Sequence, residues 1–197
     1  SMASFKTFVK IKELRLTLLD LKKFTKSSPF KLFDTNSRRN ITFSPLITGK
    51  GFLFAFICNH CPFVIHLKKH FPGVFNNWLD QGIKVYAISS NDPIEYPADS
   101  PERMLEETKE FNFNFPYLFD ENQDVAQAFK ATCTPDFFLF NECQKLVYRG
   151  QYDSSRPGGQ IEVSGKDLIN AVNRMIAGKK PSENQIPSLG CNIKWKK

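Results

Sequence analysis

Two cysteines separated by two residues, Cys58 and Cys61, form the strongest chemical pattern in this chain of 197 residues. The thiolate form of cysteine attacks disulfides, and two intervening residues bring the second sulfur within bonding reach of the first. The pair follows an apolar run at residues 51–57 and precedes Pro62, and proline favours the first position of a helix. We therefore predict that Cys58 lies at the positive end of a helix, which lowers its pKa, and that Cys61 resolves a mixed disulfide on Cys58.

The histidines near this pair leave more than one role open. His60 lies between the cysteines, where a protonated imidazole would stabilise a thiolate. Zinc binding is an alternative, because Cys58 and Cys61 with His66 and His70 offer two thiols and two imidazoles, and inert buried thiols are another. The gap between the cysteine and histidine pairs is shorter than in a zinc finger, however, and the predicted helix begins inside it. We expect redox chemistry, with no metal and no organic cofactor.

The other three cysteines give weaker signals. Cys133 is either a small buried hydrophobic residue or an auxiliary thiol, and Cys143 falls in a predicted turn, where it has no evident role. Cys191 lies in an irregular tail, from which it either folds back as a resolving thiol or simply packs. Five cysteines are an odd number, and a chain of this size needs no disulfide framework, so the CxxC pair indicates redox or metal chemistry in a reducing compartment.

Alternating strands and helices are predicted around the cysteine pair. The apolar run at 51–57 is typical of a strand covered on both faces, and Pro72 should kink or interrupt the helix that begins at Pro62. Residues 41–47 form either a second strand or an extended loop. Further strands are expected at 29–34, 83–89, 116–119, 137–140 and 145–148, and further helices at 101–111, 124–130 and 166–177. The order predicts an α/β fold with a central mixed β-sheet flanked by helices on both faces.

Composition and charge narrow the possible partners. The chain is 41% hydrophobic and 24% charged, as in a single globular domain, and it carries a net charge of +7. The basic residues are scattered and no apolar stretch has the length of a membrane span, so we expect no nucleic acid and no membrane partner, and a cytoplasmic protein. We divide the chain into an N-terminal extension (1–28), the folded domain (29–180) and a C-terminal tail that packs on it (181–197).

Several long segments, met in order, carry a resemblance to a known family. They are FICNHCPFV (56–64), AISSNDPIEYPADSPERM (87–104), FPYLFDENQDVAQAF (115–129), ATCTPDFFLF (131–140), LVYRGQYDSSRPG (146–158) and PSLGCNIKWK (187–196). The chain resembles thioredoxin-fold redoxins of the peroxiredoxin-like group, which is related to the alkyl hydroperoxide reductase and thiol-specific antioxidant family. The resemblance implies a thioredoxin-like fold and a redox role.

The resemblance also bears on Thr134 and Pro135. In redoxins a cis proline packs beside the cysteine pair, and the backbone next to it pairs with an extended substrate, so we expect Thr134 and Pro135 to shape the substrate groove. Peroxiredoxins place a threonine three residues before the peroxidatic cysteine; here Cys58 occupies that position relative to Cys61. Peroxiredoxins also carry an arginine near the start of a later strand, and in this chain Thr134 and Pro135 occupy that region instead.

These departures favour thiol–disulfide exchange over peroxide reduction. The expected partners are protein or small-molecule disulfides, or peroxides, together with a reductant that the sequence does not identify. Two alternatives remain open: a thiol peroxidase of the peroxiredoxin type, and a redox-inactive binding module that keeps the fold.

Overall fold

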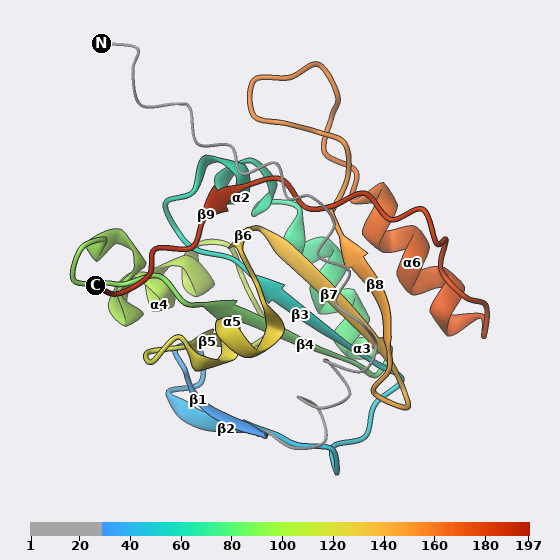
Figure 1. The fold of residues 1–197 in the computed structure, drawn as a ribbon, viewed down its shortest axis with the longest axis horizontal. Coiled ribbons are helices and arrows are strands. Elements are labelled where there is room, and N and C mark those ends of the chain that lie inside the picture. The colour runs from blue at the N-terminus through green and yellow to red at the C-terminus, as the bar shows by residue number, and fades with distance from the viewer. Residues whose placement is uncertain (1–28) are drawn as a thin grey trace.

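A computed structural model describes residues 29–197, and a mixed β-sheet forms its centre (Figure 1). The predicted extension at 1–28 lies outside the described residues. The sheet has seven strands among the described residues, in the order β2-β1-β5-β4-β3-β7-β8. They are β1 (Phe30–Asp34), β2 (Arg39–Phe43), β3 (Gly51–Phe56), β4 (Ile83–Ser89), β5 (Tyr117–Phe119), β7 (Asp136–Asn141) and β8 (Leu146–Gly150). β3, β4 and β5 run parallel to one another, whereas the other neighbouring pairs are antiparallel.

Helices cover both faces of this sheet, as predicted. On one face lie α2 (Pro62–Leu67), η1 (Pro72–Asn76), α3 (Asn77–Asp80), α4 (Pro101–Glu110) and α6 (Lys166–Ile176). On the other lies α5 (Asp124–Phe129), and Phe30 and Phe43 of the outer strands β1 and β2 belong to the core on that side. Every residue of β3 is buried, with Leu53 and Ala55 in the first core layer and Phe52, Phe54 and Phe56 in the second. This two-sided burial explains why the strand reads as a continuous apolar run.

The second core layer is built from aromatic rings. Phe54 is fully buried and its ring contacts those of Phe43, Tyr86, Phe129 and Phe140 at centroid distances of 4.9 to 5.5 Å, edge to face with Phe43 and Phe140 and stacked with Tyr86. Such contacts add to the free energy gained from burial alone. The heavy use of phenylalanine thus stabilises the face of the sheet covered by α5.

Proline and serine set the helix boundaries near the site. Pro62 is the first residue of α2, as predicted, and the helix ends at Leu67. Pro72 interrupts the helical path, which continues as the π-helix η1 before α3, so the predicted interruption is confirmed. Ser100 caps α4, because its side chain accepts a hydrogen bond of 3.3 Å from the amide of Arg103.

Two short strands lie apart from the main sheet. β6 (Cys133–Thr134) pairs antiparallel with β9 (Cys191–Asn192), in the tail for which the sequence shows no periodicity. Figure 1 shows the tail passing beside the start of α2 before it ends near α4. Residues 41–47, predicted as a strand or an extended loop, form a strand only in part: β2 covers Arg39–Phe43, because the hairpin with β1 ends before Pro45.

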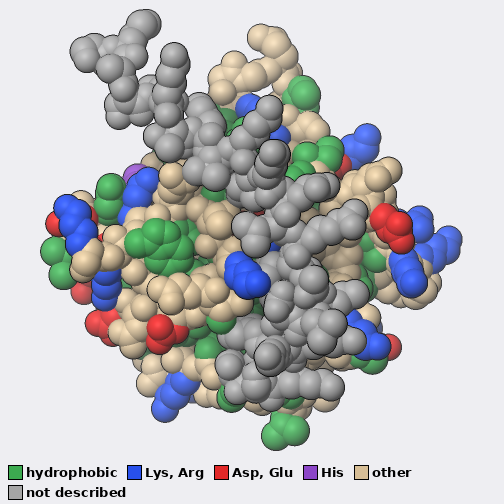
Figure 2. Space-filling model, viewed as in Figure 1, with side chains coloured by type: hydrophobic (Ala, Val, Ile, Leu, Met, Phe, Trp, Pro, Cys, Tyr) green, Lys and Arg blue, Asp and Glu red, His purple; other side chains and the backbone are tan. Residues whose placement is uncertain are grey.

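The surface gives two findings about partners. Among residues 29–197, none of the helices has the length and apolar composition needed to cross a bilayer. On the face that Figure 2 shows, Lys and Arg side chains lie in separate places and several adjoin carboxylates. Among the described residues left uncovered in that view, the basic side chains therefore form no continuous stripe.

Candidate thiol active site

The parallel pairing of β3 and β4 places the candidate site at one edge of the sheet. Cys58 follows β3 and Asn91 follows β4, and the carboxyl ends of parallel strands meet at the same edge. Cys61 is the residue that caps the N-terminus of α2, with extended backbone angles. The loop from β3 into α2 therefore holds both cysteines under the first turn of the helix.

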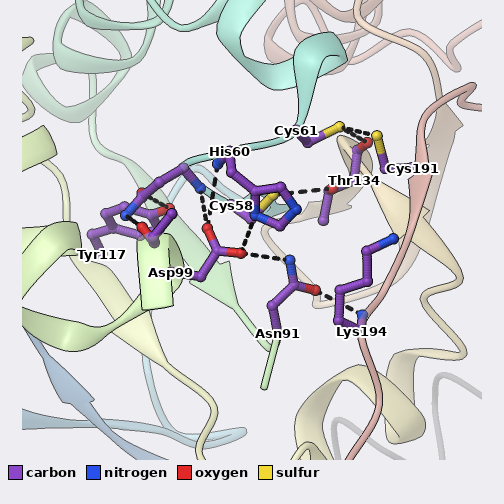
Figure 3. Close-up of polar contacts among 11 residues, drawn as sticks. Cys58, His60, Cys61, Asn91, Asp99, Tyr117, Thr134, Cys191 and Lys194 are labelled. Carbon is purple, nitrogen blue, oxygen red and sulfur yellow. Dashed lines mark hydrogen bonds and ion pairs between the residues drawn. The ribbon is translucent and has the colours of Figure 1, made fainter. Parts of the chain in front are cut away.

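Three sulfur atoms meet at this edge, not two (Figure 3). Cys58 is 2% exposed and its Sγ lies 3.5 Å from the hydroxyl of Thr134. Cys61 is fully buried; as a thiol it donates to the carbonyl oxygen of Thr134 at 3.2 Å, and its Sγ lies 2.7 Å from that of Cys191. All five cysteines are free thiols. The site is thus a cluster of thiols against the strand β6.

Electrostatics assign the thiolate to Cys61. Hydrogen bonds from the thiols of Cys191 and Cys58 lower the pKa of Cys61, with further help from the amide of Val64 in the first turn of α2. The pKa of Cys58 is raised, because its thiol donates to the Cys61 sulfur and is buried. The prediction of a low pKa for Cys58 is therefore wrong. The helix begins at Pro62, so the cysteine at its positive end is Cys61.

Thr134 and Pro135 lie beside the cysteines, as their placement in the sequence suggests. The peptide bond between them is cis. The backbone of Thr134, however, already pairs with Cys191 of β9. The position that we expected an extended substrate to occupy is filled by the tail of the same chain.

His60 is held by a carboxylate that the sequence did not single out. Its Nδ1 pairs with Oδ2 of Asp99, and its ring stacks on Tyr96 with centroids 5.4 Å apart. The hydrogen bond to Asp99 raises the pKa of His60, which favours its protonated form. Ligand atoms of Cys58, His60 and Asp99 all lie within 4.8 Å of one another. The imidazole of His60 and the carboxylate of Asp99 therefore both lie near Cys58, and the charge of the carboxylate helps to raise the pKa of its thiol.

Asp99 organises the loop around the cysteines. It is fully buried and accepts hydrogen bonds from the amide of Asn59 at 2.7 Å and from the side chain of Asn91 at 2.9 Å. Burial opposes its ionisation, but the bonds from His60 and Asn91 leave the pKa of Asp99 lowered overall. Asn91 in turn accepts from the amide of Lys194, so the network also anchors the tail. The only signal in the sequence is the run of polar residues that directly follows β4.

The arrangement bears on the zinc alternative. His66 and His70 bond to side chains of the loop that follows β8, away from the cysteine pair. Within residues 29–197, the group with metal-ligating geometry is instead Cys58, His60 and Asp99. Both carboxylate oxygens of Asp99 already accept hydrogen bonds from protein N–H groups.

The remaining two cysteines differ in environment. Cys133 is 4% exposed, and burial raises the pKa of its thiol well above the ordinary value. Its Sγ faces the carbonyl oxygens of Pro135 and Ser188 at 3.7 and 4.0 Å. Cys143 is exposed in the turn between β7 and β8. Among residues 29–197, neither of these two thiols donates a hydrogen bond to the sulfur of Cys58, Cys61 or Cys191.

Solved structures similar to this one include two that match over most of both chains. A hypothetical protein from Sinorhizobium meliloti is 41% identical, with 87% of this chain and 93% of that chain covered and a TM-score of 0.83. An uncharacterized conserved protein from Geobacillus kaustophilus is also 41% identical, with 87% and 90% covered and a TM-score of 0.83. A secreted disulfide oxidoreductase of Mycobacterium tuberculosis matches at 14% identity over 76% of this chain and 95% of its own, with a TM-score of 0.53, and supports the thioredoxin-like fold alone.

Sequence comparisons agree with the geometry of the cysteine site. The chain is 23% identical over 101 residues to the thiol-disulfide oxidoreductase ResA of Halalkalibacterium halodurans, which is 51% of this chain and 53% of that protein, so it spans about half the length of this relative. The profile of the AhpC/TSA family matches residues 24–149, more than half of the chain, and includes the CxxC pair and the cis proline. With a thioredoxin-like fold and a thiol cluster at the expected edge of its sheet, the chain belongs to the AhpC/TSA family.

Proposed function

We propose that this protein is a thiol–disulfide oxidoreductase in which Cys58 and Cys61 cycle between dithiol and disulfide. The observation that carries the proposal is the placement of Cys61, which is the N-cap residue of α2 and whose sulfur lies 2.7 Å from that of Cys191; hydrogen bonds from the neighbouring thiols lower its pKa. A thiolate held this way is the reactive form in disulfide exchange. The roles of the two cysteines are then the reverse of those expected from the sequence.

The reaction proceeds in two exchanges. The Cys61 thiolate attacks one sulfur of a substrate disulfide, a mixed disulfide forms, and the other substrate sulfur leaves as a thiolate that takes up a proton. Cys58 then loses its proton and attacks the Cys61 sulfur; the bond between Cys61 and the substrate breaks, and the second substrate sulfur leaves as a thiolate that takes up a proton. The substrate disulfide is reduced to two thiols, and the protein is oxidised to the Cys58–Cys61 disulfide.

Substrates and compartment form part of the proposal. Disulfides of proteins or small molecules are the expected oxidants, and a thiol reductant restores the dithiol. The odd number of cysteines, all of them free, supports a reducing compartment such as the cytoplasm.

Peroxide reduction is a second candidate, because Cys61 lies where peroxiredoxins hold their peroxidatic cysteine and its pKa is lowered. In that case the Cys61 thiolate attacks a peroxide oxygen, water or an alcohol leaves, and a sulfenic acid forms on Cys61. Cys58 would then condense with the sulfenic acid to give the same disulfide and water. A sulfenic acid trapped on Cys61 in Cys58→Ser/Cys191→Ser protein, which lacks both neighbouring thiols, identifies this activity.

Insulin reduction with dithiothreitol tests the leading proposal. We expect turnover by the wild type, and loss of turnover in Cys61→Ser and in the double variant Cys58→Ser/Cys191→Ser, which leaves Cys61 with neither neighbouring thiol. Cys143→Ser is the matched control, because Cys143 is exposed in a turn away from the site. In a second series, the small disulfide oxidised glutathione replaces insulin. Because the tail covers the backbone of Thr134, a large substrate could fail to reach the cysteines of an active protein. Equal activity of the wild type and Cys61→Ser on both substrates refutes the proposal.

A further inference from the structure

The third sulfur of the cluster comes from a segment that is distant in the chain. Cys191 lies in β9, and its Sγ is 2.7 Å from that of Cys61, compared with about 2.05 Å in a formed disulfide. Figure 3 shows the two sulfur atoms facing each other beside Thr134. The Cys61 sulfur accepts hydrogen bonds from both Cys58 and Cys191. It is therefore positioned to bond with either of them.

The backbone of the tail is fitted to this position. β9 pairs with β6 at Thr134↔Cys191, next to the cis bond of Pro135. A Cβ at Gly190 would lie 1.9 Å from the carbonyl oxygen of Thr134, a distance that such contacts do not reach, so only glycine allows the tail to come this close. On its other side, Lys194 is fixed by the hydrogen bond from its amide to Asn91. Cys191 is thus held at both ends of its segment.

Exposure separates the three thiols. Cys61 is fully buried and Cys58 is 2% exposed, whereas Cys191 is partly exposed. A disulfide between Cys58 and Cys61 is therefore buried, and a reductant in solution cannot reach its sulfur atoms directly. Cys191 is the thiol of the cluster that solvent reaches.

We propose that Cys191 is a third redox-active thiol, which exchanges with the Cys58–Cys61 disulfide at the Cys61 sulfur and carries the oxidised state to the surface. The proposal rests on the proposed function, which supplies that disulfide. Cys191 loses its proton and attacks the Cys61 sulfur; the Cys58–Cys61 bond breaks, Cys58 leaves as a thiolate and takes up a proton, and a Cys61–Cys191 disulfide forms. One disulfide replaces another, so no external oxidant is needed.

Reduction then begins at the tail. A reductant thiolate attacks the Cys191 sulfur, and Cys61 leaves as a thiolate; a thiol with a low pKa is the better leaving group. A second reductant thiol displaces the first from Cys191, which returns as a thiol, and the reductant leaves as its own disulfide. In the reduced protein, the hydrogen bond from Cys191 to the Cys61 sulfur raises the pKa of Cys191. That hydrogen bond is absent while Cys61 is in a disulfide, so Cys191 then loses its proton more easily for its attack on Cys61.

Disulfide mapping distinguishes the two oxidised forms. Cys58 and Cys61 share one tryptic peptide, residues 51–68, whereas Cys191 lies in residues 180–194. A Cys58–Cys61 disulfide therefore leaves peptide 51–68 unlinked and two hydrogens lighter than the dithiol form. A Cys61–Cys191 disulfide instead joins peptide 51–68 to peptide 180–194. Full-length protein is oxidised with oxidised glutathione, quenched with acid, alkylated and digested without reduction.

In Cys58→Ser protein we expect the two peptides to be joined, with little glutathione left on Cys61. In Cys191→Ser protein we expect the Cys58–Cys61 disulfide to form, but its reduction by reduced glutathione to be slower than in the wild type by about tenfold or more. Cys143→Ser should match the wild type in both measurements. Glutathione that persists on Cys61 of Cys58→Ser without joining, or equally fast reduction of Cys191→Ser, overturns the proposal. Absence of the Cys58–Cys61 disulfide in Cys191→Ser refutes instead the proposed function.

Discussion

Replacement of Gly190 by alanine perturbs the tail without touching a sulfur atom. The added Cβ would stand 1.9 Å from the Thr134 carbonyl oxygen and 2.6 Å from its carbonyl carbon, whereas real contacts stay beyond 3.0 Å. Both atoms are backbone, so no side chain can rotate away, and β9 must move by roughly 1 Å or more. Forced displacement in a packed region costs about 1–3 kcal/mol of folding free energy. The contact between Cys191 and Cys61 is then broken.

Two measurements follow this displacement. The pKa of Cys61 should rise, because the Cys191 thiol is the largest contribution that lowers it, and the ultraviolet absorbance of the thiolate against pH reports the change. Hydrogen exchange of the Ile193 amide, which donates to the carbonyl oxygen of Thr132 at 3.2 Å, should become faster. Gly73→Ala is the matched control, since its Cβ would meet no atom within 4 Å. A Gly190→Ala protein with wild-type titration and wild-type exchange refutes the placement of the tail.

Three further predictions concern the charge network and the core. Asp99→Asn should lower the pKa of His60 toward its ordinary value of 6.5, because the carboxylate is what raises it; NMR titration of the ring protons checks this, and an unchanged pKa contradicts it. Burial raises the pKa of Asp136 to about 6 from 3.8, so its protonated form is favoured in the folded state. The stability that the protonated Asp136 contributes is therefore full below about pH 4 and is lost as the pH rises to about 6. In urea unfolding, the free energy of unfolding should fall by up to about 3 kcal/mol over this range, and Asp136→Asn should remove the fall. The same dependence of the unfolding free energy on pH in both proteins would exclude this assignment. Phe54→Ala, which empties a fully buried site, should cost about 3–5 kcal/mol in the same assay. Phe33→Ala, where the ring is 39% exposed, should cost less than half as much, and equal losses would contradict the core assignment.

The secondary structure near the cysteines was largely predictable, because local signals determine it. β3 is buried on both faces, and its continuous apolar run follows directly from that burial. Pro62 marked the start of α2 correctly. The same proline already implied that the preceding residue, Cys61, is the cap. The sequence therefore contained the information that places Cys61 at the start of the helix, and the prediction assigned that position to Cys58 instead.

Other parts of the site depend on contacts between distant segments, which leave no local pattern. The pairing of Cys191 with Thr134 involves only two residues on each strand, too few for any periodicity to appear. Asp99 lies in the short 3-10 helix η2 (Pro97–Asp99), where the sequence resembles an ordinary polar loop. Its burial depends on the amides that surround it after folding. Such residues are found from tertiary structure and not from sequence spacing.

The state of the Cys61 sulfur is the central claim, and thiolate absorbance against pH measures it most directly. The wild type should show a thiolate that forms below a pH of about 7. This step should persist in Cys58→Ser, where the serine hydroxyl can still donate to the sulfur, and it should vanish in Cys61→Ser. A step that persists in Cys61→Ser and vanishes in Cys58→Ser would contradict the account and return the nucleophile to Cys58.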